Sequence, residues 1–177
     1  MCIRDSLQLS EVSTLVDLLG GDLTFKWTWI FAANTDYATL KEKAEAAPQG
    51  ERDACRGDEW KGQVAGVTQS DEMAELVDIM GGDLDYKWHW MFTPGTRWDH
   101  ILAKAEAAPQ NERDACRGDN WKPRVIAAVS EDGMAILVDV MGGDLAWKLD
   151  WMYDKGSNWG LIQPKVEAAP QLSLIHI

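Results

Sequence analysis

The chain has 177 residues, of which 46% are hydrophobic and ten are tryptophan, and its formal net charge is −12. This apolar content can offset chain entropy, which excludes an intrinsically disordered protein. The acidic charge argues against nucleic acid as a partner, because such binding depends on Lys and Arg displacing counterions from phosphates. A basic partner or a cation suits the composition better, a protein or a carbohydrate is the expected class of ligand, and no stretch is long and apolar enough to predict a membrane span.

Both ends of the chain resemble translated adapter DNA. Residues 1–6 (MCIRDS) and 172–177 (LSLIHI) can be encoded by DNA strands that are reverse complements of each other. Two unrelated termini would not share this relation, and such scars are set aside before a fold is inferred. We therefore expect residues 7–171 to be an internal fragment of a longer chain, and we predict no localisation.

One stretch, LVDLLGGDLTFKWTW at 15–29, recurs in similar form at 76–90 and 137–151, a spacing of 61 residues. The period predicts three tandem copies, 7–67, 68–128 and 129–171, of which the third is truncated. Between copies, aromatic residues replace aromatic ones, as at Phe25, Tyr86 and Trp147, which is what a packed interior tolerates. Repeats bury their apolar faces against each other, so no copy is expected to be stable alone.

The first element of each copy is predicted to be a helix. Its N-cap is expected at Ser10, Asp71 or Asp132. Apolar residues follow at i, i+3, i+4 and i+7, as at Val12, Leu15, Val16 and Leu19, and a glycine doublet supplies the C-cap. In the third copy Gly133 weakens the helical pattern, and a hairpin at 131–133 is an alternative.

The second element alternates apolar and polar residues, which predicts a strand with one apolar face. In the first copy the apolar positions are Leu23, Phe25, Trp27, Trp29 and Phe31. The expected fold is therefore α+β, a tandem array in which each 61-residue repeat contributes a Trp-rich β-strand and short helices. If the first element were also a strand, the alternative would be an all-β array of propeller-like blades.

The rest of each copy is less regular. A turn is predicted next, with Pro94-Gly95 as its clearest case. The segment from Thr35 fits either a helix or a hairpin arm, because Gly160 and Pro164 in the third copy are poor helix residues.

A short helix is predicted after Pro48 and again after Pro109, ending at Gly57 or Gly118. The final segment, from Trp60 or Trp121, fits strand and helix equally. Cys55 and Cys116 provide one cysteine in each of the first two copies, and we expect reduced thiols that are buried or half-buried, since no Cys/His cluster suggests zinc.

A pair of aspartates flanks each glycine doublet and forms the first candidate site. The pairs are Asp17 and Asp22, Asp78 and Asp83, and Asp139 and Asp144. If both acids crowd the partially negative end of a helix, a bound cation would relieve the repulsion, and oxygen ligands favour Ca²⁺. The simpler alternative is that Asp22 caps a turn and Asp17 pairs with a Lys or Arg, since no known calcium-loop spacing is present.

The second candidate site is a set of aromatic residues that could stack on sugars or contact a protein. The set is Trp29, Trp60, Trp90, Trp98, Trp121, Trp151 and Trp159, with Tyr37 at the position equivalent to Trp98. The alternative is that these rings form the core, which the alternation favours.

Enzyme chemistry has little support in the sequence. Outside the adapter-like ends, the histidines are His89 and His100, both in copy two, so neither is a base that every copy requires. No nucleophile elbow, phosphate loop or paired-histidine motif occurs. We predict a non-enzymatic repeat protein for binding or assembly, with one cation or ligand site per repeat. The alternative is part of a larger enzyme whose catalytic residues lie outside this fragment.

Overall fold

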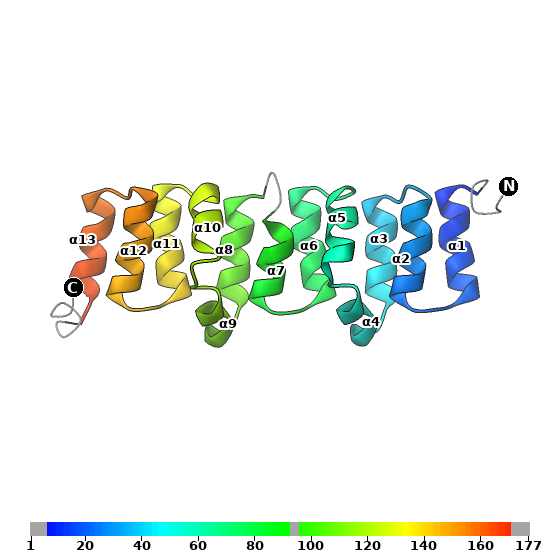
Figure 1. Ribbon diagram of the computed structural model, residues 1–177, viewed down its shortest axis with the longest axis horizontal. Coiled ribbons are helices and arrows are strands. Elements are labelled where there is room, and N and C mark those ends of the chain that lie inside the picture. Colours follow the sequence, from blue (N-terminus) through cyan, green and yellow to red (C-terminus); the bar gives the residue numbers. More distant parts are fainter. Residues whose placement is uncertain (1–6, 93–95, 171–177) are drawn as a thin grey trace. The chain divides into compact units, whose positions relative to one another are not determined.

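The computed structural model describes residues 7–92 and 96–170. Within these ranges the chain forms thirteen α-helices and no strand (Figure 1). The adapter-like segments 1–6 and 172–177 and the predicted Pro94-Gly95 turn lie outside the described residues. The helices gather into two compact units, Met1–Gly82 and Asp83–Ile177.

The helices recur with the period of the sequence. The first unit contains α1 (Leu9–Leu19), α2 (Leu23–Ala32), α3 (Tyr37–Ala46), α4 (Gln49–Ala54), α5 (Asp58–Ala65) and α6 (Ser70–Met80). The second contains α7 (Leu84–Met91), α8 (Trp98–Ala107), α9 (Gln110–Ala115), α10 (Lys122–Ala128), α11 (Glu131–Met141), α12 (Leu145–Lys155) and α13 (Trp159–Ala168). Helices α1, α6 and α11 begin at residues 9, 70 and 131, and α3, α8 and α13 at 37, 98 and 159, so equivalent helices are 61 residues apart.

The predicted Trp-rich strand is wrong, because this segment is helix α2, as its counterparts are α7 and α12. The α+β fold and the all-β alternative are therefore both wrong, and the described chain is all-helical. An alternation at i, i+2, i+4 and i+6 also contains two i, i+4 pairs, which are neighbours on a helix. In α2 these are Phe25 with Trp29 and Trp27 with Phe31, whose ring centroids lie 5.9 and 6.1 Å apart.

Packing on more than one side explains why α2 carries apolar residues around most of its circumference. Leu23, Trp27 and Ile30, at i, i+4 and i+7, are fully buried. Helix α2 contacts α1, α3 and α4 (Figure 1). A helix covered by three neighbours loses the single apolar stripe by which amphipathic helices are recognised.

The predicted first helix is confirmed in all three copies, as α1, α6 and α11. The hairpin alternative in copy three is wrong, since Gly133 lies inside α11. The N-caps lie two residues before the expected ones, at Gln8, Gln69 and Ser130. The C-caps are glycines with a positive φ that L side chains rarely adopt, Gly20, Gly81 and Gly142.

The segments that the sequence left undecided are helices. The segment after Thr35 is α3, and its copy α13 tolerates Pro164 inside the helix. The short helix after Pro48 is confirmed as α4, although it ends at Ala54 and Gly57 instead caps the start of α5. Cys55 and Cys116 are buried and free, as expected.

Close packing between consecutive repeats depends on Gly133. In the second unit α8 packs against α11, and a Cβ atom at Gly133 would lie 2.9 Å from Cε2 of Trp98. Gly62, in α5, is the opposite case, because an added Cβ would meet no atom within 4 Å. The indole of Trp98 therefore occupies the space that a side chain at 133 would need.

These two glycines make a matched pair of substitutions. Gly62→Ala should raise the free energy of unfolding by about 0.5–1 kcal/mol, because alanine loses less backbone entropy in a helix. Gly133→Ala should lower it by about 1 kcal/mol, because overpacking against Trp98 outweighs that gain. Urea unfolding of both variants measures the difference, and an equal gain in both would contradict the packing of Trp98 on Gly133.

Candidate functional site

In copies one and three the first aspartate of the pair connects three helices. Asp17 of α1 lies between two lysines, with Oδ1 3.3 Å from Nζ of Lys26 in α2 and Oδ2 2.5 Å from Nζ of Lys43 in α3. In copy three, Asp139 of α11 likewise accepts hydrogen bonds from Lys148 in α12, at 2.9 Å, and Lys165 in α13. Copy two carries the same residue types, Asp78, Lys87 and Lys104.

Lys43 is the most buried member of this cluster, with only 2% of its side chain exposed. Burial alone would lower the pKa of Lys43, but hydrogen bonds to Asp17 and Glu42 outweigh it and raise the pKa above 10.5. Burial likewise acts to raise the pKa of Asp17, and the two lysines overcome this and hold it below 3.8. Both groups are therefore charged at neutral pH, and each charge stabilises the other.

The second aspartate of each pair caps the following helix. Asp22 Oδ1 accepts a hydrogen bond from the backbone N–H of Phe25 at 2.8 Å. Asp83 and Asp144 accept equivalent bonds from Tyr86 and Trp147, both at 2.9 Å. These carboxylates lie at the positive end of a helix dipole, which is favourable without a cation.

The two aspartates of a pair thus have separate structural roles, one in an ion pair and the other as a helix cap. This agrees with the simpler alternative inferred from the sequence. Across residues 7–92 and 96–170, no three His, Cys, Asp or Glu side chains gather into a group that could hold a metal ion. The calcium site remains a prediction that calcium titration can test.

The short helix α4 joins two consecutive repeats through backbone atoms. Glu51 Oε2 accepts a hydrogen bond from Leu23 N at 2.9 Å, at the start of α2. Gln49 Nε2 donates to the carbonyl of Met80 at 3.0 Å, and Arg56 donates to the same oxygen at 2.7 Å, at the end of α6. In the second unit α9 repeats the bonds, from Leu84 N to Glu112 and from Gln110 to the carbonyl of Met141.

Copy three has a pocket at the place where α4 and α9 bind in the other copies. It lies between the end of α11, the start of α12 and the end of α13, and is lined by Asp139, Gly143, Asp144, Leu145, Lys148, Pro164, Lys165, Ala168, Ala169 and Pro170. Leu145 corresponds to Leu23 and Leu84, whose N–H groups bind the short helix in the other copies. The pocket therefore has the position of the site that a short linking helix fills elsewhere.

Most residues of the aromatic set are in the core. Trp60, Trp90, Trp121 and Trp151 are each at most 7% exposed. Trp60 packs on Trp27, with centroids 5.5 Å apart, and Trp121 packs on Trp88 at 5.6 Å. These four rings leave little surface on which a sugar could stack. Trp29 and Trp98 are half-buried.

Trp159 is the exception, because 62% of it is exposed. It is the first residue of α13, and the equivalent first residues of α3 and α8 are Tyr37 and Trp98. Tyr37 donates a hydrogen bond to Glu75 of α6, and Trp98 packs on Gly133 of α11. In both cases the aromatic residue contacts the first helix of the next repeat.

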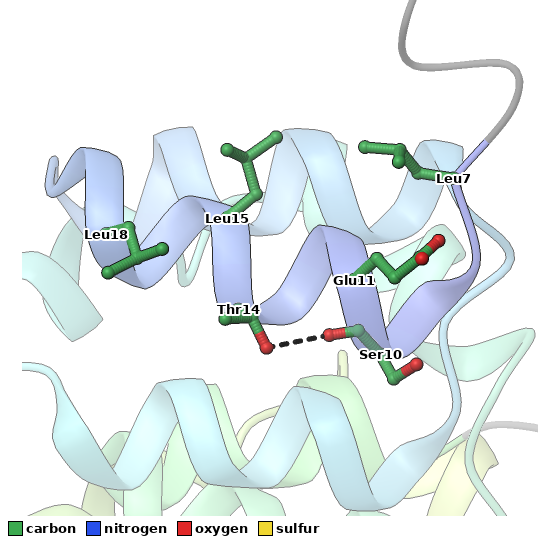
Figure 2. A pocket seen from close by; sticks show the side chains of 6 residues that line it. All are labelled: Leu7, Ser10, Glu11, Thr14, Leu15 and Leu18. Carbon is green, nitrogen blue, oxygen red and sulfur yellow. Dashed lines mark hydrogen bonds between the residues drawn. The ribbon is translucent and has the colours of Figure 1, made fainter.

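The start of the described chain presents a complementary exposed surface. A shallow groove along α1 is lined by Leu7, Ser10, Glu11, Thr14, Leu15 and Leu18, and Figure 2 shows these side chains together. Leu18 is 81% exposed and Leu19 is 59% exposed. At the position of Leu19 in copy three, Met141 is fully buried. We refer to this groove together with Leu19 as the α1 face.

The sequence analysis did not identify the α1 face as a candidate site. The available signal was position 14, which changes character between copies, from Thr14 to Glu75 to Ile136. The structure shows that Glu75 contacts the preceding repeat, through Tyr37 and Lys41. The variation at this position therefore falls where, in copy two, one repeat contacts the preceding one.

No helix in the described part of the chain is both long and apolar enough to cross a membrane. In the comparisons with known proteins, no family model, curated protein or solved structure matches this chain.

Removing the Asp17 carboxylate should destabilise the first unit. Asp17→Asn leaves the buried ammonium of Lys43 with Glu42 as its remaining acidic partner, and we expect a loss of about 1–3 kcal/mol in the free energy of unfolding. The matched control is Glu45→Gln, which removes a 3.8 Å surface pair with Lys41 and should cost less than about 1 kcal/mol. Urea unfolding at neutral pH measures both.

The pH dependence of this loss follows from the direction of the pKa shifts. The pKa of Asp17 is lowered on folding, so its contribution is present above pH 3.8 and disappears as the pH falls through the lower folded value. The pKa of Lys43 is raised, so its contribution disappears only as the pH rises above 10.5. The difference between wild type and Asp17→Asn should therefore shrink below pH 3.8, and a constant difference would contradict the ion pair.

Substitutions at Asp22 distinguish a helix cap from a calcium ligand. Asn caps a helix as well as Asp, so Asp22→Asn should change stability by less than about 0.5 kcal/mol, whereas Asp22→Ala should cost about 0.5–2 kcal/mol. We expect the same values with and without added CaCl₂. A calcium-dependent rise in the melting temperature that Asp22→Asn abolishes would instead support the calcium site.

Proposed function

We propose that this chain is a non-enzymatic helical-repeat module that binds other polypeptides, or assembles with them, by extending its own stack of helices. The observation that carries the proposal is the exposure of Leu18 and Leu19 on α1, whose counterparts α6 and α11 pack on α3 and α8. Exposed apolar surface of this kind marks sites of protein association.

The charged groups support a binding role more than a catalytic one. Asp17 and Asp139 are held by lysines, and Asp22 and Asp83 cap helices. Catalytic acids and bases are instead expected in a cleft with pKa values moved toward neutrality. The carboxylates of this cluster have lowered pKa values, as Asp17 and Asp139 do, which favours structure.

A polypeptide is a better ligand than a carbohydrate on the same grounds. The apolar side chains exposed on the α1 face are leucines, which pack against other apolar side chains but provide no flat ring for a sugar. Internal junctions of the chain already show helices packing on this helix type, as α8 does on α11. The junctions between repeats are therefore examples of the helix packing that we propose.

Self-association provides the direct test. Sedimentation velocity of the wild-type chain should show a mass that rises with protein concentration, and Leu18→Lys with Leu19→Lys should reduce it, because two charges would be buried at the interface. Both side chains are exposed, so the variant should keep its helical circular dichroism. The control, Ala127→Lys, adds a charge at an exposed site on α10 and should associate like wild type.

A chain that stays monomeric at every concentration would contradict assembly by this face. Association that is unchanged in the double variant would move the binding surface away from α1.

A further inference from the structure

We draw no further inference here: the strongest candidate, the pocket between the end of α11, the start of α12 and the end of α13, adjoins residues 171–177, which lie outside the described residues, so nothing in the structure shows what covers it.

Discussion

The first helix of each copy has apolar residues on two sides, and its own repeat covers only one of them. In the second unit α11 packs on α12 and α13 of its own copy, and on α8 and α9 of the preceding one. Met134, Leu137, Val138 and Met141 are fully buried as a result. Helices of this length are marginal alone, so most of their stability comes from tertiary packing. Each repeat therefore depends on its neighbour, and among the described residues Leu18 and Leu19 of α1 remain exposed.

Two kinds of contact hold neighbouring repeats together, those to backbone atoms and those between side chains. They differ in how freely their residues can be substituted. The linking helices α4 and α9 bind backbone atoms, the N–H groups of Leu23 and Leu84 and the carbonyls of Met80 and Met141. Backbone groups are the same in every copy, so the side chains that bind them have little freedom to change. This fits the identity of Gln49 and Glu51 with Gln110 and Glu112 in two segments, 45–61 and 106–122, that differ only at Gly50 against Asn111 and Glu59 against Asn120.

The sequence predicted the period, the first helix and its glycine caps, but it did not predict the helical nature of the Trp-rich segment. Phe25, Trp27, Trp29 and Phe31 alternate as they would in a strand, and the pattern could not reveal that α2 is packed by α1, α3 and α4. One local signal favoured a helix, since Asp22 is a good N-cap and caps α2. For the aspartates, the simpler alternative of a cap and an ion pair needed only residues already in the chain, and the calcium site stays a prediction.

The α1 face was missed for a different physical reason. A position that varies between copies looks unimportant when one helix is considered alone. The variation among Thr14, Glu75 and Ile136 can be interpreted only together with the residues that face this position in the preceding repeat. The linking helices α4 and α9 bind backbone atoms at the junctions between repeats, so they contribute affinity but no selectivity. Selectivity is left to the side-chain pairs at positions such as 41 with 75, because a mismatched pair would bury a charge without a partner. We propose that α1, on which Leu18 and Leu19 are exposed, also associates through side chains.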